Sequence, residues 1–379
     1  MSIALQTTLL PTYSASRVTF VDGLGARLFD TDGREYLDFA AGIAVVSLGH
    51  RHPAPLAAAH AQLDRLWHAS NLFGTEPVRA LASKLSERFG GAQAFFCNSG
   101  TEANEAALKY ARKATGRSGV IALEQGFHGR TIGALSVTGQ PAKREPFAPL
   151  LPGVRFVQPN DVLSLHAAAS RDVGLILLEP VLGEGGVIGL EPEFIAAAAA
   201  LADELGALLA FDEVQTGVGR TGTFFAFEQV GVRPQLLTLA KGLANGLPIG
   251  CLLVADEAAG AFVPGDHGST FGGNPVVCAA AIAVCDAIDD GLLSQVRSNG
   301  DRLRAGLAGL AHVVEVRGRG LLVGAELDVP AQSFVDAALD AGLVCLTSGA
   351  SVLRLAPPLV VTPSDVDRAL EILTEVLNA

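Results

Sequence analysis

The stretch Leu236-Leu-Thr-Leu-Ala-Lys-Gly242 decides the fold class of this chain, because an uncharged apolar strand leads directly into a single lysine. A strand that is apolar along its whole length is typical of a parallel sheet with both faces covered. Ligands of such sheets bind at the carboxyl ends of the strands. Lys241 is therefore either a Schiff-base lysine whose pKa is lowered by burial, or a lysine that extends to the surface, and its position alone favours neither.

Similar apolar strands alternate with helices on both sides of this stretch. Helices are expected over Glu102–Lys113 and Phe194–Leu205, followed by Gly116 and Gly206, because glycine favours the left-handed conformation that commonly ends a helix. The alternation predicts an α/β fold with a mostly parallel sheet covered by helices. Strands are expected at residues 94–97, 120–123, 175–178, 207–211, 236–240 and 250–254.

The two chain ends have a different pattern. Asp22-Gly23 and Asp32-Gly33 predict hairpin turns near the N-terminus. A helix over 275–288 is capped by Asn274, and the last helix begins with the capping-box pattern of residues 362–365. Two domains are predicted: a large α/β domain over residues 46–268, and a small α+β domain formed by residues 1–45 and 269–379, with strands at 313–316 and 321–326.

Composition restricts the class of protein. Of the 379 residues, 49% are hydrophobic and 17% are charged, which is typical of a globular protein with a large core. The net charge of −12 disfavours a nucleic-acid partner, since phosphate binding needs a basic face. The most apolar stretch, residues 195–211, is interrupted by Asp203, Glu204 and Gly206, so no membrane span is expected.

The cysteines and the N-terminal residues indicate the cellular compartment in which the protein is expected. The five cysteines form no Cys-x-x-Cys pair, and we interpret them as buried free thiols of a reducing compartment rather than metal ligands or disulfides. Residues 1–10 lack a basic segment and a cleavage site, so no signal peptide is predicted. These features together predict a cytoplasmic protein.

Polar residues follow the predicted strands. Asp212 ends one strand, and a buried carboxylate needs a charged partner, which is either a pyridinium nitrogen or a residue in a structural salt bridge. Ser99-Gly100-Thr101 lies between a strand and a helix, where backbone amides and hydroxyls form either a phosphate site or an ordinary helix cap. Neither alternative is excluded at these two places.

Further candidates suit a planar cofactor and a substrate carboxylate. Phe127 and Arg130 follow another strand and offer an aromatic plane beside a guanidinium group. Glu184 lies in a glycine-rich loop, and Arg354 lies between apolar residues of a strand, where an arginine is either paired or used in binding. A lysine, an aspartate, a phosphate cradle, an aromatic ring and two arginines together indicate pyridoxal phosphate.

Two other motifs resemble a dinucleotide-binding site and a metal-binding site, but the residues around each favour another interpretation. Residues 217–222 match the glycine fingerprint of nicotinamide enzymes, but the aromatic run over 223–227 follows instead of a helix. His50 and His52 have the spacing of a metal-ligand pair, but a polar pair in a loop before Pro53 is the better interpretation. We therefore expect neither a dinucleotide site nor a metal site.

The order of the motifs resembles a known family, the class III aminotransferases of the acetylornithine aminotransferase type, which have the fold type I of pyridoxal-phosphate enzymes. The resemblance covers nearly the whole chain. It implies a homodimer with active sites at the subunit interface, and amino-acid and 2-oxo-acid substrates. The motifs are Gly33–Phe39, Gly42–Val45, Leu48–His50, Phe96–Glu105, Phe127–Thr131, Glu179–Pro180, Gly183–Gly186, Phe211–Gly217, Gly219–Gly222, Leu239–Gly242 and Gly268–Pro275.

The resemblance also implies roles in cofactor binding. Lys241 is the Schiff-base lysine, Asp212 pairs with the pyridine nitrogen, and Gln215 lies near the phenolic oxygen. Phe127 stacks on the ring. The phosphate is held by the segment Ser99-Gly100-Thr101 and by Thr270 of the partner subunit. Many relatives carry alanine at the position of Thr101, and the hydroxyl here is expected to add a phosphate donor.

The roles implied for substrate binding concern two carboxylates. Arg130 binds the α-carboxylate of the ornithine-type donor, and Arg354 binds that of 2-oxoglutarate. Glu184 pairs with Arg354 while the donor is bound and releases it for the dicarboxylate. Tyr13 and Asn274 are further candidates for the site.

The implied reaction is a ping-pong transfer of the δ-amino group of N2-acetylornithine to 2-oxoglutarate in arginine biosynthesis, through a Schiff base on Lys241. It gives N-acetylglutamate 5-semialdehyde and glutamate. Alternative donors are succinylornithine, ornithine, N-succinyl-diaminopimelate and 4-aminobutyrate, although Gly42–Val45 resembles the acylornithine enzymes more. A non-catalytic protein of the same fold is a further alternative, which retention of Lys241 and Asp212 disfavours.

Overall fold

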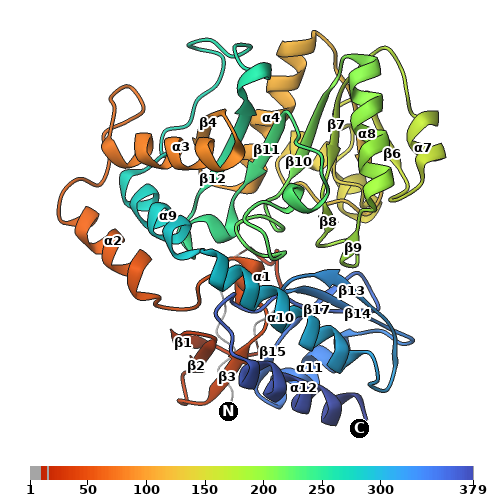
Figure 1. Cartoon of the computed structure of the whole chain (residues 1–379). Helices are drawn as coiled ribbons and strands as arrows, with labels where there is room; N and C mark the ends of the chain where they lie inside the picture. Colours follow the sequence, from red (N-terminus) through yellow and green to blue (C-terminus); the bar gives the residue numbers. More distant parts are fainter. Residues whose placement is uncertain (1–9, 15–16, 379) are drawn as a thin grey trace.

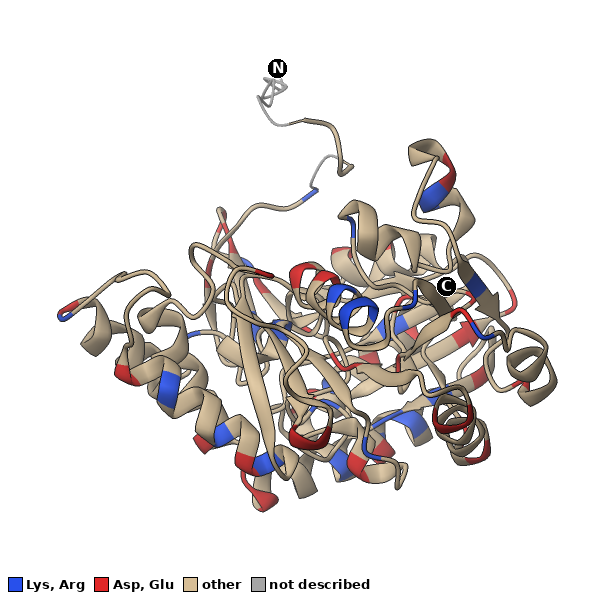
Figure 2. Ribbon diagram, turned by 90° about the horizontal axis from the view of Figure 1, so that it is seen from above, with Lys and Arg blue, Asp and Glu red and all other residues tan. Residues whose placement is uncertain are grey.

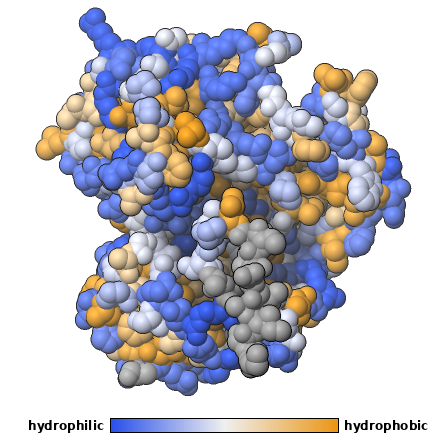
Figure 3. All heavy atoms as spheres, turned by 180° about the vertical axis from the view of Figure 1, so that it is seen from behind, coloured by the Kyte–Doolittle hydropathy of each residue, from blue (hydrophilic) through white to orange (hydrophobic). Residues whose placement is uncertain are grey.

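The structure, a computed structural model, describes residues 10–14 and 17–378. Figure 1 shows two lobes, an upper one built around a large sheet and a lower one that contains the strands nearest both chain ends. The short α1 (Ala41–Ala44) lies where the lobes meet. Seen from behind in Figure 3, the surface is hollowed between the lobes.

The upper lobe contains a seven-stranded sheet in the order β4-β12-β11-β10-β7-β5-β6. β12 runs antiparallel to both of its neighbours, and the other pairings are parallel. The predicted α/β fold with a mostly parallel sheet is therefore confirmed. The strands are β4 (Ala92–Cys97), β5 (Gly119–Leu123), β6 (Val154–Val157), β7 (Val173–Leu178), β10 (Leu208–Asp212), β11 (Leu236–Leu239) and β12 (Gly250–Ala255).

Helices cover both faces of this sheet, as side-chain alternation requires. Leu209 and Phe211 of β10 belong to one hydrophobic cluster together with residues of α8 (Pro192–Leu205). Ala210, between them, belongs to a second cluster with residues of α4 (Gly100–Thr115). Gly116 and Gly206 end these two helices in the left-handed conformation, as predicted.

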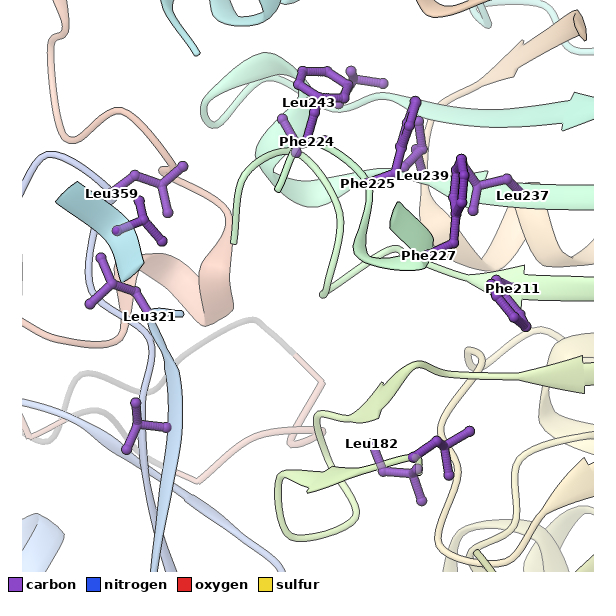
Figure 4. Packing of buried hydrophobic residues seen from close by; sticks show 14 of the residues in the cluster. Leu182, Phe211, Phe224, Phe225, Phe227, Leu237, Leu239, Leu243, Leu321 and Leu359 are labelled. Carbon is purple, nitrogen blue, oxygen red and sulfur yellow. The ribbon is translucent and has the colours of Figure 1, made fainter. Parts of the chain in front are cut away.

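The aromatic run after residues 217–222 packs into the core. Figure 4 shows Phe225 and Phe227 beside the leucines of β11, and their rings stack with centroids 5.4 Å apart. The segment before them is a tight turn closed by the Gly219 amide, which donates to the Phe224 carbonyl at 3.1 Å. A dinucleotide fingerprint needs a helix at this place, and a buried aromatic turn occupies it instead.

The lower lobe joins the two chain ends. The parallel pairing of β3 (Glu35–Asp38) with β15 (Leu343–Val344) places the N-terminal hairpin strands β1 (Phe20–Leu24) and β2 (Arg27–Asp30) beside the C-terminal region. A second sheet contains β13 (Val313–Arg319), β14 (Leu322–Leu327), β17 (Val352–Leu355) and β16 (Leu346–Ser348). The helices here are α10 (Asp290–Leu307), α11 (Gln332–Asp340) and α12 (Pro363–Leu377), whose predicted capping box of Thr362 and Asp365 is present.

The helix after Asn274 belongs with the upper lobe by its packing. α9 (Pro275–Ala287) packs against α2 (Pro53–Leu63) and α3 (Glu76–Phe89), and Figure 1 shows all three on the same side of the large sheet. This packing favours a domain boundary after α9 rather than at residue 269. The remaining elements are α5 (Ile132–Ser136), α6 (Pro141–Arg144), α7 (Val162–Ala167), β8 (Val181–Leu182), β9 (Ile188–Gly189) and the 3₁₀ turns Glu145–Phe147, Ala226–Gln229, Lys241–Ala244 and Asp256–Ala258.

One predicted hairpin turn is wrong. Asp22-Gly23 lies inside β1, where the pairing with β2 is irregular, and the chain reverses instead around Gly25, whose φ is 58°. The reason is that the Asp22 carboxylate accepts the Gly23 amide at 2.8 Å and pairs with Arg51, so this dipeptide stabilises an irregular strand. The second turn is confirmed, with Gly33 at φ 79° between β2 and β3.

The surface carries charges of both signs. Figure 2 shows acidic and basic residues interspersed over the outer helices. Among the helices of residues 10–14 and 17–378, none combines the length and apolar character that crossing a membrane would need. The same residues contain no group of three or more His, Cys, Asp or Glu side chains that could hold a metal ion. Nε2 of His50 lies 2.8 Å from Oδ2 of Asp38.

Candidate active site

A cavity of about 400 Å³ lies at the carboxyl ends of the central strands. It is lined by residues that directly follow or end five different strands, so the parallel topology collects side chains that are far apart in the sequence. These residues are Ser99 after β4, Phe127 after β5, Glu179 after β7, Asp212 at the end of β10 and Lys241 after β11.

Asp212 lies at the base of this cavity with three hydrogen-bond donors around it. Its Oδ2 accepts from Nδ1 of His128 and from Nδ2 of Asn104, each at 2.7 Å, and its Oδ1 accepts the amide of Val214 at 3.0 Å. The side chain is 4% exposed and forms no ion pair with a lysine or arginine of the described chain. The sequence left two alternatives for the partner of Asp212, a pyridinium nitrogen or a residue in a structural salt bridge. In the structure, His128 is the only side chain of the described residues that could form such a salt bridge.

His128 and Asn104 were not predicted as functional residues. Asn104 accepts the hydroxyl of Thr238 at 2.8 Å and thereby orients its amide toward Asp212. Burial lowers the pKa of His128, but the hydrogen bond and the charge of Asp212 outweigh burial, and the pKa is raised. The sequence signal for His128 was its place between Phe127 and Arg130, whereas nothing in the sequence distinguished Asn104 from other polar helix residues.

Lys241 stands at the start of a 3₁₀ turn with an unusual backbone. Its φ is 39°, in the left-handed region that costs a residue with a side chain about 1–2 kcal/mol. Burial is the main cause that lowers the pKa of its ammonium group, although Glu184 opposes the shift. A lowered pKa favours the neutral amine, which is the form that attacks a carbonyl carbon.

The N-terminus of α4 offers free backbone donors to the cavity. Ser99 caps the helix, since its Oγ accepts the Glu102 amide at 3.3 Å and donates to the Glu102 carboxylate at 2.7 Å. The ordinary helix cap therefore explains the Ser99 hydroxyl. The amides of Gly100 and Thr101 form no hydrogen bond within the part of the chain that the structure describes, and both residues line the cavity.

The hydroxyl of Thr101 is engaged by a neighbouring loop. Its Oγ1 lies 2.8 Å from Oγ1 of Thr131, which donates to Oε1 of Glu105 at 2.6 Å. Because Thr131 gives its proton to Glu105, Thr101 is the donor in the first contact. Thr101 thus connects the helix N-terminus to the segment that carries Phe127 and Arg130.

Phe127 is held by a buried carboxylate. Its amide donates to Oε1 of Glu179 at 2.8 Å, while Oε2 of Glu179 accepts the amide of Gly183 at 3.3 Å. Burial is the main cause that raises the pKa of Glu179 to about 7; His128 lowers it and Asp212 raises it further. The sequence motif Glu179–Pro180 predicts no role for Glu179, and in the structure this residue joins Phe127 to the loop of Glu184.

Arg354 and Glu184 form the predicted ion pair. Nη1 of Arg354 lies 2.5 Å from Oε1 of Glu184 and also donates to the Gly183 carbonyl at 2.9 Å. Burial raises the pKa of Glu184, but the charge and the hydrogen bond of Arg354 outweigh it and lower the pKa. Gln215 lies on the cavity wall, with Oε1 3.4 Å from the same Nη1.

The segment before the cavity has a left-handed turn. Four consecutive residues, 41–44, have φ between 47° and 67°, and the next residue, Val45, lines the cavity. Asp38 anchors the turn, because its Oδ1 accepts the amides of Ala40 and Ala41 at 3.0 and 2.7 Å. The sequence does not predict this conformation. Of the four residues, only Gly42 adopts the left-handed region readily.

Five candidate residues are not part of the lining of this cavity within one chain: Tyr13, Glu184, Thr270, Asn274 and Arg354. Tyr13 is 90% exposed and is not part of the lining. Thr270 and Asn274 line a separate cavity of about 320 Å³. The side chain of Asn274 caps α9 through the Val276 amide at 3.0 Å and donates to the Trp67 carbonyl at 2.7 Å, so its contacts are those of a structural residue.

The residues of the main cavity suit pyridoxal phosphate. Two free amides at a helix N-terminus match a phosphate, and a buried carboxylate without a lysine or arginine partner matches a protonated ring nitrogen. An aromatic ring and a lysine of lowered pKa complete the set. The volume is also within the usual range for small-molecule sites.

Comparisons with known proteins give the family. Residues 12–377 match the model of Aminotransferase class-III. Acetylornithine aminotransferase of Corynebacterium efficiens is 47% identical, covering 97% of this chain and 94% of the relative. The enzyme of the same name from Streptomyces coelicolor is 49% identical, covering 93% and 89%.

Solved structures agree with this result. An N-acetylornithine aminotransferase from Stenotrophomonas maltophilia K279a is similar with a TM-score of 0.84 and 36% identity, covering 96% of both chains. An ornithine aminotransferase from Toxoplasma gondii is similar with a TM-score of 0.93 and 32% identity, covering 98% of this chain and 92% of the other. The chain therefore belongs to the class-III aminotransferases and is a pyridoxal-phosphate-dependent transaminase.

Proposed function

We propose that this enzyme transfers the δ-amino group of N2-acetylornithine to 2-oxoglutarate, forming N-acetylglutamate 5-semialdehyde and glutamate, and that it serves arginine biosynthesis. The observation that carries the proposal is the Arg354–Glu184 pair next to the cavity that Arg130 lines. The pair adjoins that cavity because Nη1 of Arg354 lies 3.4 Å from Oε1 of Gln215 in the cavity wall. N-acetylornithine carries one carboxylate, whereas 2-oxoglutarate carries two. A site that accepts both substrates needs one cation that binds a carboxylate of either substrate, and a second cation that can be neutralised while the donor is bound. The relatives named acetylornithine aminotransferase at 42–49% identity support the choice of donor.

The cofactor would be held by residues of four strand ends. Lys241 would attach it through Nζ, the amides of Gly100 and Thr101 would hold its phosphate, and Asp212 would hold its ring nitrogen protonated. Phe127 would stack on the ring, and Gln215 would face the phenolic oxygen. When bound, pyridoxal phosphate withdraws electrons from the substrate carbon that carries the nitrogen.

Lys241 has a second task once the donor's amine has replaced it. Its neutral Nζ takes the proton from the carbon that carries the nitrogen, and the lowered pKa favours this neutral form of the amine. His128 and Asn104 donate to the same oxygen of Asp212 and thereby fix the position of this carboxyl group. The carboxyl group on which chemistry at the δ-carbon depends is thus buried and fixed by hydrogen bonds.

The two substrates are distinguished by Glu184. While N-acetylornithine is bound, Glu184 neutralises Arg354, and Arg130 binds the α-carboxylate of the donor. 2-Oxoglutarate brings a second carboxylate next to the reacting carbon, which displaces Glu184 from Arg354. The 2.5 Å contact is the masked state that the donor half of the reaction requires.

We also propose a homodimer in which Thr270 of the partner subunit contacts the phosphate. Thr270 is exposed and lies apart from the main cavity of its own chain. Large apolar side chains near it are also exposed: Leu72 at 87%, Phe73 at 71% and Phe271 at 61%. Such a patch is typical of a surface covered by another chain.

A cytoplasmic location is proposed on the basis of the cysteines. All five, at positions 97, 251, 278, 285 and 345, are buried free thiols, as the sequence analysis expected. Burial raises the pKa of the Cys97 and Cys345 thiols to about 12, so these thiols are unreactive. Free buried thiols are usual in proteins of a reducing compartment.

The donor is tested by steady-state comparison. With 2-oxoglutarate as the acceptor, kcat/KM is measured for N-acetylornithine, N-succinylornithine, ornithine, N-succinyl-diaminopimelate and 4-aminobutyrate. The proposal predicts the highest value for N-acetylornithine. The strongest competing candidate is ornithine, because the Toxoplasma gondii ornithine aminotransferase has a similar fold, and a higher kcat/KM with ornithine would overturn the choice of donor.

A further inference from the structure

Lys143 is a cation of the active-site region that the roles above leave unused. It belongs to α6, is half-buried, and its Nζ lies 4.8 Å from the centroid of the Phe127 ring. Within residues 10–14 and 17–378, no hydrogen bond or ion pair engages this ammonium group. A partly desolvated charge without a counterion is unfavourable, so its presence beside the site calls for an explanation.

Arg130 is an exposed cation beside the same ring, and it also lacks a carboxylate partner in the described part of the chain. Its Cζ lies 5.6 Å from the Phe127 centroid, and its guanidinium forms no ion pair with a carboxylate of the described residues. The pKa of Lys143 is lowered mainly by burial; Glu184 opposes this, and Arg130 and Arg354 lower it further. Two unpaired cations that repel each other form a receptor for an anion.

The missing anion does not come from the protein. Glu184, the carboxylate with the largest influence on Lys143, is already bound to Arg354 at 2.5 Å. Glu179 is occupied by the two amides of Phe127 and Gly183. A substrate carboxylate is the anion left to complete this group.

We propose that Lys143 binds, together with Arg130, the carboxylate that lies away from the reacting carbon. In the proposed function, on which this inference rests, that group is the α-carboxylate of N-acetylornithine and the γ-carboxylate of 2-oxoglutarate. Lys143 is not part of the cavity lining, but the Phe127 ring that its ammonium contacts is. The four-carbon stem of a lysine is flexible, so binding a carboxylate in the cavity needs only a side-chain movement. Lys143 is thus a substrate-binding residue in both halves of the reaction.

The competing explanation is that Lys143 only supports Phe127 through the cation–π contact. A supporting role would affect cofactor retention and all substrates equally. A binding role affects only substrates that carry the distal carboxylate. Two matched pairs of substrates separate the roles: 2-oxoglutarate against 2-oxopentanoate, and N-acetylornithine against N-acetylputrescine, where the second member of each pair lacks that carboxylate.

The test uses the variants K143Q and K143R of the cofactor-loaded enzyme. For K143Q, the ratio of kcat/KM between 2-oxoglutarate and 2-oxopentanoate is expected to fall about 10- to 100-fold, the usual effect of losing a hydrogen bond to a charged group. The ratio for the donor pair falls by a similar factor. K143R keeps most of both ratios because it retains the charge. K84Q is the control, since Lys84 pairs with Asp286 on the surface at 2.5 Å.

If K143Q lowers kcat/KM equally for both members of each substrate pair, Lys143 only supports Phe127 and the inference is overturned. If K143Q leaves kcat/KM of all four substrates unchanged, the inference is overturned as well. The outcome remains distinguishable from failure of the proposed function. A wild-type enzyme that does not use 2-oxoglutarate would overturn the proposed function, and this inference with it. A wild-type enzyme that does use it, beside an unaffected K143Q, would overturn the role of Lys143 alone.

Discussion

Nη1 of Arg354 donates to Oε1 of Glu184 across 2.5 Å, in a site where Arg354 itself is only 4% exposed. Because the arginine is buried, its charge needs either this carboxylate or a substrate carboxylate at all times. We therefore propose that the pair is a mask, which 2-oxoglutarate displaces and the donor leaves in place.

The variant E184Q tests this mask. Loss of the charge leaves Arg354 free, so the half-reaction with N-acetylornithine is expected to slow about tenfold, while the half-reaction with glutamate changes little. Rapid mixing of the cofactor-loaded enzyme with each substrate alone gives the two rates. Equal slowing in both halves would count against the mask.

His128 holds the carboxylate under the cofactor. Replacement by phenylalanine removes one of the two donors to Oδ2 of Asp212 and keeps a planar side chain in the buried space. Weaker retention of pyridoxal phosphate is expected, with a dissociation constant raised about 10-fold or more. The measurement is equilibrium dialysis of the cofactor, and H312F serves as the control because His312 pairs with Asp328 on the surface. An unchanged dissociation constant in H128F would refute this role.

Glu213 predicts a pH dependence of stability. Its side chain is buried and accepts the amides of Ala226 and Phe227, yet burial, the main cause, raises its pKa to about 8. A carboxyl group with a raised pKa in the folded state adds stability that is fully present below its ordinary pKa of 4.5 and is lost as pH rises toward 8. The free energy of unfolding of the wild type should therefore fall across this window more steeply than that of E213Q.

Urea unfolding at several pH values measures both curves. Glutamine resembles the protonated carboxyl group, so the two proteins should be close in stability at the acid end of the window. Their difference isolates Glu213 from the other groups that titrate. Parallel curves for the two proteins would show that Glu213 does not have a raised pKa.

The positions of the strand-end residues were predictable from the sequence. Apolar strands that alternate with helices place Asp212 and Lys241 at the same edge of the sheet, and the structure brings both into one cavity. Their proximity follows from topology, which the hydrophobic pattern determines.

Other features depend on contacts that no local pattern reveals. Asn104 and His128 contact Asp212 across long stretches of sequence, and Glu179 joins two loops through its two oxygens. The left-handed turn at residues 41–44 is imposed by its surroundings, including Asp38, rather than by propensity. The hairpin predicted at Asp22-Gly23 was wrong because side-chain contacts of Asp22 use that dipeptide within a strand.

The central claim is that Lys241 carries the cofactor and that N-acetylornithine transfers its δ-amino group to this cofactor. The most direct measurement follows the visible absorption of the enzyme loaded with pyridoxal phosphate when N-acetylornithine is added without an acceptor, in parallel with K241A. For the wild type, we expect a visible absorption band that disappears rapidly with N-acetylornithine and slowly with ornithine. For K241A, we expect no such change. A band that persists with N-acetylornithine, or full activity in K241A, would contradict it.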